Sequence, residues 1–139
     1  MTNGYFYEHV VTPKDVTASG IAHDGSYIEW ACSAREQMLV DHFYISEVPP
    51  PRYLVGEAYV RYMSPAYLND RIEICIAVSD RNVEKGYAKL DFRFSRKASG
   101  QLIARGHQVI FFHDRQTGNR VPLPDEFMKL MEDLETEAL

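Results

Sequence analysis

The sequence predicts an α+β fold in which one antiparallel sheet buries one long helix. A long segment of helical period lies near the N-terminus, and four segments with a period of two follow a run of three prolines. No helical pattern separates the later strands. Parallel strands need a crossover between them, usually a helix, so the sheet is expected to be antiparallel. The length of 139 residues fits one domain, expected over residues 1–139.

The N-terminal part reads as a strand, a loop and then the long helix. Residues 5–11 are rich in aromatic and β-branched residues, as in a strand, whereas residues 14–26 collect Asp, Thr, Ser and Gly. A helix is expected from about Gly25 to His42, with Asp24 or Ser26 as its cap. Its two neighbouring stripes are Tyr27, Trp30, Ala31, Ala34, Met38 and His42, and Ile28, Cys32, Arg35 and Leu39.

After Pro49-Pro50-Pro51 the hydrophobic pattern alternates, which predicts strands. The expected strands lie near 57–62, 72–78, 88–94 and 102–112, with turns at 68–70, 82–86 and 99–100. In the first of these strands Ala58, Val60 and Tyr62 form one face. A short helix is expected from Asp125 to about Glu137, with Phe127, Leu130, Met131 and Leu134 on one side.

Composition excludes several functional classes. The formal net charge of −5 gives no basic field for nucleic acid. No apolar run approaches the roughly 20 residues of a membrane span, and the first residues lack a signal-peptide pattern, so a cytoplasmic protein is expected. Cys32 and Cys75 lie far apart without CxxC spacing, and we expect two reduced thiols rather than a disulfide or metal site.

The loop and helix carry a recognisable combination of residues. Asp15 and Gly20 in the loop precede Tyr27, Trp30 and Arg35 in the helix. This combination resembles the hotdog-fold thioesterases of the 4-hydroxybenzoyl-CoA thioesterase type.

Three further fragments resemble the thioesterases paired with enediyne polyketide synthases. They are W-x4-R-E-x-M-L at 30–39, L-I-A-R-G-H-Q-V at 102–109 and V-P-L-P at 121–124. The resemblance covers nearly the whole chain. It implies a hotdog fold, in which a five-stranded antiparallel sheet wraps around the long helix, and hydrolysis of an acyl-CoA or acyl-carrier-protein thioester. The acyl group is expected to be aromatic, polyketide or fatty, and no metal or other cofactor is implied.

The resemblance also implies a homodimer or homotetramer whose sheets join edge to edge, with sites at the subunit interface. One position departs from the pattern of the 4-hydroxybenzoyl-CoA type. Thr17 stands where that type has its catalytic carboxylate, and a threonine hydroxyl cannot act as a general base near neutral pH. The enediyne-type relatives also lack this acid, so hydrolysis remains the expected activity.

Four residues are candidates for catalysis: Thr17, His23, Asp24 and Arg35. Backbone N–H groups around Gly20 to Gly25, at the helix N-terminus, would stabilise a developing oxyanion. His23 or Asp24 would replace the missing carboxylate, and Thr17 would hold water or the acyl carbonyl. Arg35 matches an arginine implicated in catalysis in the enediyne-type relatives. The alternatives are an N-cap for Asp24, a solvent-facing His23, a loop-stabilising Thr17, and an ion pair from Arg35 to Glu36 or Asp41.

Candidate substrate-binding residues are Gly20, Ile21, Tyr27 and Trp30. Gly20 permits a tight turn and close approach of a substrate, although a plain turn glycine is the alternative. Tyr27 would line the acyl pocket or instead pack against the sheet. Arg93, Arg96 and Lys97 form the one local basic cluster, which is a candidate for CoA phosphates or a solvated strand face.

Two other functions stay open. A hotdog dehydratase or hydratase would carry a G-D-x-N-P-x-H element, which is absent. A non-catalytic acyl-binding protein would explain the threonine at position 17.

Overall fold

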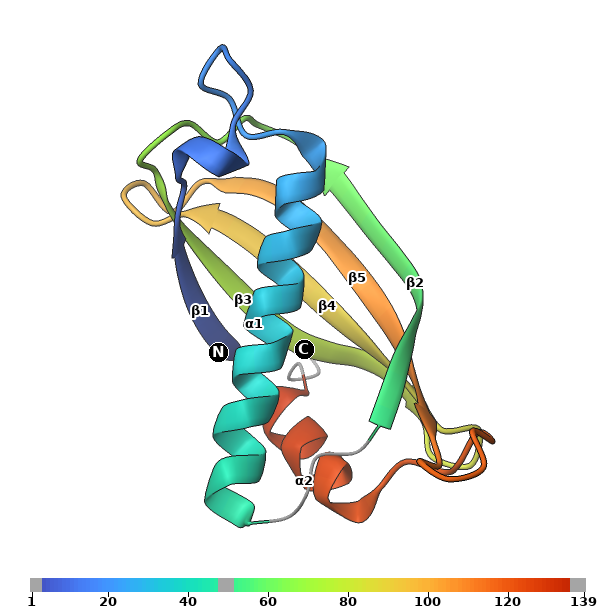
Figure 1. The fold of residues 1–139 in the computed structure, drawn as a ribbon. Coiled ribbons are helices and arrows are strands. Elements are labelled where there is room, and N and C mark those ends of the chain that lie inside the picture. The colour runs from blue at the N-terminus through green and yellow to red at the C-terminus, as the bar shows by residue number, and fades with distance from the viewer. Residues whose placement is uncertain (1–3, 48–51, 136–139) are drawn as a thin grey trace.

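The computed structural model describes residues 4–47 and 52–135. The elements, drawn in Figure 1, are β1 (Tyr5–Val10), the 3-10 helix η1 (Pro13–Asp15), α1 (Asp24–Ser46), β2 (Arg52–Tyr62), β3 (Arg71–Asn82), β4 (Tyr87–Arg96), β5 (Leu102–His113) and α2 (Asp125–Leu134). The sheet has the order β1-β3-β4-β5-β2, and every pair in it is antiparallel.

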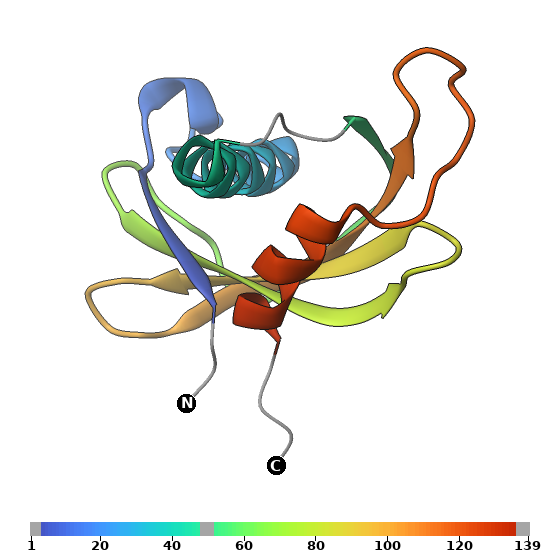
Figure 2. The same ribbon diagram turned by 90° about the horizontal axis from the view of Figure 1, so that it is seen from below.

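The sheet curls around α1, which runs along its concave face. Viewed along α1 in Figure 2, β1 and β2 rise on either side of the helix, and α2 packs beside it on the same face of the sheet. This is the hotdog fold, and it confirms the predicted α+β class.

The core lies between α1, α2 and the inner face of the central strands. The alternation predicted for β3 and β4 is confirmed, because every second residue from Ile72 to Val78 and from Ala88 to Phe94 is buried. The first helical stripe is buried from Tyr27 to Met38, and the apolar side of α2 is also buried. Cys32 and Cys75 are both free thiols.

β2 is more exposed than its alternating pattern predicted. Ala58 and Tyr62 are exposed and only Val60 of the expected inner face is half-buried. β2 pairs with β5 alone, so one of its edges is free. A strand at the edge of a sheet has unpaired backbone groups on one side, and its side chains have no neighbouring strand on that side to cover them, which accounts for the difference.

The observed helices differ from the predicted ones at their ends. α1 runs four residues beyond His42, because Phe43 is still buried against the core, and it stops where Glu47 adopts a left-handed conformation with φ of 58°. The N-cap is His23 rather than Asp24 or Ser26. α2 stops at Leu134 rather than near Glu137, since Glu135 is extended. Pro49 to Pro51 lie outside the described residues.

Asp15 anchors the connection between β1 and α1. Its side chain is 2% exposed and Oδ2 accepts three hydrogen bonds, from Thr12 N–H (2.9 Å), Thr12 Oγ1 (3.0 Å) and His9 Nε2 (2.8 Å). Its backbone carbonyl accepts two more, from His23 N–H at 3.0 Å and from Ser26 Oγ at 2.7 Å. The start of α1 is therefore tied to η1 and, through His9, to the sheet.

Replacing Asp15 with Asn should make stability less dependent on pH. Burial alone would raise the pKa of the Asp15 carboxyl, but its bonds to Thr12 and His9 lower it below the ordinary value. A carboxyl with a lowered folded-state pKa stabilises the protein above its unfolded pKa of about 4, and this contribution is lost as the pH falls through the folded-state value. Urea unfolding of Asp15→Asn and wild type should thus differ more at pH 7 than at pH 3.

Asp80→Asn is the matched control, because Asp80 is exposed on β3. Its difference from wild type should be small at both pH values. A wild-type advantage over Asp15→Asn that stays constant from pH 7 to pH 3 would contradict the assignment.

Candidate functional site

The N-terminus of α1 presents an amide that is free to bind an anion. The Gly25 N–H donates to Asp24 Oδ1 at 3.0 Å, and the Ser26 N–H donates to the His23 carbonyl at 3.1 Å. Within the described part of the chain the Asp24 N–H has no partner. A free N–H at the positive end of a helix dipole is suited to stabilising an oxyanion.

Fewer backbone N–H groups are free between Gly20 and Gly25 than the sequence predicted. The Gly20 N–H donates to the Thr17 carbonyl, the Ala22 N–H to the Ala66 carbonyl, and the His23 N–H to the Asp15 carbonyl. Among the residues described, Ile21 and Asp24 keep their N–H groups unbonded.

The hydrogen bonds of Ser26 determine which ring nitrogen of His23 carries the proton. Ser26 Oγ has one proton, and it donates that proton to the Asp15 carbonyl at 2.7 Å. The contact between His23 Nε2 and Ser26 Oγ, at 3.0 Å, must therefore use a proton on Nε2. In the neutral imidazole Nδ1 then carries the lone pair. A Cβ at position 25 would lie 3.5 Å from Nδ1, so Gly25 leaves this nitrogen uncovered on its side.

Thr17 and Gly20 form a tight turn in the loop before α1. The Thr17 hydroxyl donates to the Ile21 carbonyl at 3.3 Å and contacts Ser19 Oγ at 2.8 Å. Gly20 has φ of +84°, a conformation that favours glycine, and a Cβ there would meet nothing within 4 Å. The glycine is thus required by the turn and not by a crowded neighbour, while Thr17 is exposed.

A groove of about 340 Å³ opens beside the start of α1. Its lining includes Ile21, Asp24 and Tyr27, so three of the predicted site residues lie together. Tyr62 of β2 closes one side of the groove, and its hydroxyl donates to the Asp24 carbonyl at 2.7 Å.

Tyr27 and Trp30 are largely core residues. Tyr27 is 3% exposed, burial raises its pKa, and its ring lies 5.6 Å from that of Phe94 on the sheet. Trp30 is 2% exposed, and its ring lies 4.8 Å from that of Tyr27 and 4.9 Å from that of His9. Trp30 therefore packs against the Tyr27 ring and does not line this groove.

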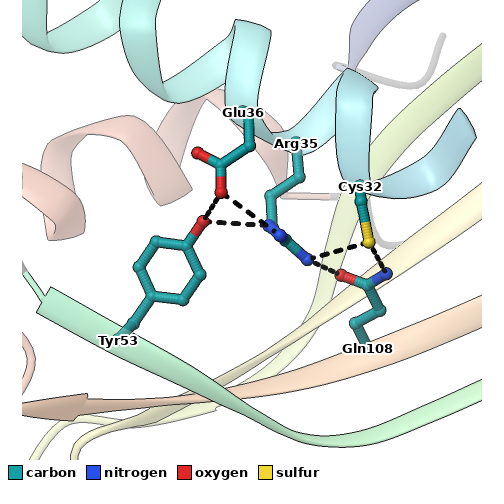
Figure 3. A network of polar contacts seen from close by, with 5 residues as sticks. All are labelled: Cys32, Arg35, Glu36, Tyr53 and Gln108. Atoms are coloured by element: carbon teal, nitrogen blue, oxygen red, sulfur yellow. Dashed lines mark hydrogen bonds and ion pairs between the residues drawn. The ribbon is translucent and has the colours of Figure 1, made fainter. Parts of the chain in front are cut away.

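Arg35 is buried in a polar network between α1 and the sheet (Figure 3). Its guanidinium donates to Gln108 Oε1 of β5 at 2.5 Å and to the Tyr53 hydroxyl of β2 at 3.0 Å. It also forms an ion pair with Glu36 at 3.2 Å and contacts Cys32 Sγ at 3.7 Å. The predicted alternative, an ion pair with Glu36, is therefore present in the structure.

The network keeps the guanidinium charged in a buried place. Burial alone would lower the pKa of Arg35, but its interactions with Tyr53, Cys32 and Glu36 raise it. Burial and the hydrogen bond to Glu36 raise the pKa of Tyr53 to about 12, so Tyr53 remains a neutral hydroxyl that donates to Glu36 and accepts from Arg35.

The network stands at one end of a second groove, of about 630 Å³. This groove lies between the later turns of α1 and the first half of β2. Apart from Arg52, the rest of its lining is mostly apolar: Leu39, Val40, Phe43, Tyr44, Leu54 and Val55. An apolar groove that carries charged groups can hold a chain that has a polar head.

Within a single chain, Arg35 does not lie near the start of α1. Asp24 and Arg35 are separated by 11 positions, a rise of about 17 Å along the helix. The candidate residues thus form two groups. Thr17, His23 and Asp24 lie near the first groove, whereas Arg35 lies on the second.

Gln108 and Tyr53 are the two residues of the network that the sequence did not indicate. Gln108 is 3% exposed in a strand that is otherwise apolar on this face, and a lone glutamine there was the one available signal. The predicted basic cluster is split, because Arg96 pairs with Asp70 and Lys97 with Glu8, whereas Arg93 has neither partner.

The described residues hold no group of three or more His, Cys, Asp or Glu side chains that could bind a metal ion. No helix in the described part of the chain is long and apolar enough to span a membrane.

Solved structures of similar fold include several thioesterases. A 1,4-dihydroxy-2-naphthoyl-CoA thioesterase from Synechocystis superposes with a TM-score of 0.81 at 20% identity, over 94% of this chain and 97% of its own. The dynemicin thioesterase, studied with a bound polyene, gives a TM-score of 0.82 at 19% identity over 97% and 99%. A Staphylococcus aureus protein in complex with CoA gives 0.83 at 14% identity over 100% and 90%.

No curated protein matches the sequence significantly. The model of the thioesterase-like superfamily matches residues 11–131, a span that begins just after β1 and includes α1, the other four strands and most of α2. On this match the chain belongs to the thioesterase-like superfamily.

Proposed function

We propose that this chain hydrolyses acyl thioesters at the N-terminus of α1, with the acyl group carried by CoA or by an acyl carrier protein. The observation that carries the proposal is the pair of free groups at the start of one helix. Asp24 offers an unbonded N–H, and the neighbouring His23 offers an unprotonated Nδ1. Together they supply an oxyanion donor and a base without the carboxylate that Thr17 replaces.

The chemistry runs in two steps. His23 Nδ1 takes a proton from water as the water oxygen attacks the thioester carbonyl carbon, and the Asp24 N–H stabilises the resulting oxyanion. The C–S bond then breaks, and the leaving thiolate takes the proton from His23. The products are a carboxylic acid and a free thiol.

The remaining candidates have supporting roles in this proposal. Thr17 and Gly20 hold the turn that shapes the loop, and Ile21 forms part of the wall of the first groove. Arg35 and its network terminate the second groove, which takes the acyl chain. Names of the solved relatives refer to naphthoyl-CoA and polyene ligands, which fits a flat or extended apolar acyl group.

We propose that the active form is a homodimer paired through β2, or a homotetramer made of two such dimers. β2 has a free edge of 11 residues, whereas the other edge strand, β1, has 6. Both grooves use this part of the chain. Arg52 to Val55 line the second groove, and Tyr62 to Pro65 line the first. A partner seated on β2 would therefore border both grooves and exclude water from them.

A panel of acyl-CoA and acyl-carrier-protein thioesters tests the activity. We expect steady-state release of free thiol from at least one aromatic or long-chain substrate, measured with a thiol reagent. Absence of thiol release from the whole panel, together with measurable acyl-CoA binding, would support the non-catalytic reading instead. Hydration of an enoyl thioester without thiol release would support the hydratase reading.

His23→Gln should lower kcat by about 100-fold or more, because it removes the base. The control His113→Gln changes a histidine at the far end of β5, bonded to the Phe111 carbonyl, and should keep the wild-type kcat. A wild-type kcat in His23→Gln would show that another group activates the water.

Arg35→Ala should lower kcat/KM by at least about tenfold, because the charged end of the second groove is lost. Circular dichroism should show a retained fold. Tyr53→Phe keeps the guanidinium but removes its bond to Nε, and it should lower kcat/KM less. Full activity in Arg35→Ala would restrict Arg35 to the structural ion pair with Glu36.

A further inference from the structure

Three arginines form a row across the outer face of the sheet, the face turned away from α1. Arg105 of β5 lies directly opposite Arg93 of β4 on one side and Arg61 of β2 on the other. Residues directly opposite each other in an antiparallel pair point to the same face, with Cβ atoms about 5 Å apart. We call Arg61, Arg93 and Arg105 the arginine row.

The guanidinium groups of the arginine row have no bonded acid within the described residues. Over residues 4–47 and 52–135 none of the three guanidinium groups has a hydrogen bond or an ion pair, and all three side chains are exposed. Like charges directly opposite each other destabilise a sheet. The chain has 20 acidic and 15 basic residues, so acids are abundant, yet no acid is paired with the row.

Most other arginines of the chain have a partner within the described residues. Arg35, Arg71, Arg81 and Arg96 each pair with a carboxylate, Arg52 bonds to the Arg115 carbonyl and Arg120 lies over the Phe111 ring. The row differs in placing three unbonded guanidinium groups on one face, with Asp91 beside them but not bonded to them. Such a row can bind an external anion.

The outer face is also hollowed beside the row. A depression of about 630 Å³ is lined by Arg93 and Arg105 together with Tyr59 and His107, and its one carboxylate is Asp91. The two rings are stacked at 5.3 Å, and His107 is held by Glu57 at 2.7 Å. The row thus borders a concave surface that a side chain of a partner can enter.

We propose that the arginine row docks the acidic surface of a carrier protein whose prosthetic arm holds the acyl thioester. The proposal rests on thioester hydrolysis as the proposed function of the site. Adjacent strands are about 4.8 Å apart, so the row extends over about 10 Å. A line of charge of this length matches the side of an acidic helix.

The lack of free backbone donors argues against a small phosphate as the ligand of the row. Phosphate sites usually use main-chain N–H groups at helix ends or in nests. The row lies within the ladder of three paired strands, where backbone amides are used in strand pairing. Only the exposed guanidinium groups are available, and these suit a broad acidic surface.

The row ends where the first groove opens. Arg61 precedes Tyr62, whose hydroxyl donates to the Asp24 carbonyl at the start of α1. A carrier protein on the outer face therefore needs its arm to pass only the end of β2, at Met63 to Pro65, to reach the groove lined by Asp24 and Tyr27, and pairing along the β2 edge leaves this end open.

A second copy of this chain fits the row poorly. A two-fold contact centred on the row would place arginine against arginine. The exposed acids of α1, Glu29, Glu36 and Asp41, could face the row of another copy only in a heterologous contact, which generates open filaments unless its rotation closes a ring.

The test variant is Arg105→Glu, the central position of the row. The new carboxylate would lie between two arginines, an arrangement that stabilises a sheet, so the fold is expected to survive. Lys85→Glu is the matched control, because it makes the same charge change at an exposed turn between β3 and β4. The substrates carry one octanoyl group on a bacterial acyl carrier protein, on CoA, or on N-acetylcysteamine.

With the carrier-protein substrate, kcat/KM of Arg105→Glu should fall by about tenfold or more through KM, while kcat is retained. The CoA and N-acetylcysteamine substrates should change by less than about twofold, as should all three substrates with Lys85→Glu. Wild-type kcat/KM on the carrier protein should decrease with added salt.

Binding of the unacylated carrier protein, measured by titration calorimetry, separates docking from catalysis. Weaker binding to Arg105→Glu than to wild type supports the docking surface, whether or not any substrate is hydrolysed. Absence of hydrolysis together with such weaker binding overturns only the proposed function. Three results overturn the docking proposal: unchanged carrier-protein binding, an equal loss on CoA, which would assign the row to phosphates, or concentration-dependent self-association that Arg105→Glu abolishes.

Discussion

Asp15 organises the start of α1 through both its carboxylate and its backbone. The carboxylate is bound to Thr12 and His9, so the loop is fixed to the edge of the sheet. The Asp15 carbonyl accepts a hydrogen bond from the Ser26 hydroxyl, and this bond determines which nitrogen of His23 keeps a lone pair. The same carbonyl accepts a hydrogen bond from the His23 N–H, so the free amide at the start of the helix is that of Asp24. The chemistry proposed for this end of the helix therefore depends on a residue that does not touch the substrate.

Arg35 illustrates a different solution to burying charge. A guanidinium removed from water is costly unless its donors are satisfied, and here α1, β2 and β5 each contribute acceptors. This joins the edge strand to the helix at the point where the second groove begins. Movement of β2, as on binding a partner at its free edge, would be transmitted to the guanidinium through Tyr53.

Periodicity was sufficient to predict the central part of the fold. Ile72, Ile74 and Ile76 alternate with the less buried Glu73, Cys75 and Ala77 because one face of β3 is buried, and that pattern is visible in the sequence. The end of α1 was not predictable, since aromatic and β-branched residues after His42 suit a strand as well as a helix. Its start was predicted to within one residue, but its cap was not, because Ser26 bonds to a residue 11 positions earlier, a contact that no local capping rule describes.

The candidate site was predictable only in part. Thr17, Gly20 and Ile21 lie in one turn, as their spacing suggested. Gln108 gave little signal, because a polar residue in a strand reads as outward-facing. The arginine row depends on register, and a shift of one residue would turn these side chains to the other face. The sequence alone does not specify the register of the strands, so the row can be identified only from the strand pairing in the structure.

Trp30 is the one tryptophan of the chain, and its position gives the protein an internal optical reporter. Its ring lies between His9, which is bonded to Asp15, and Tyr27, which lines the first groove. The emission of a buried indole changes with the polarity and charge around it. Protonation near Asp15 and occupation of the groove beside Tyr27 thus act on the same fluorophore from opposite sides, without any label being introduced.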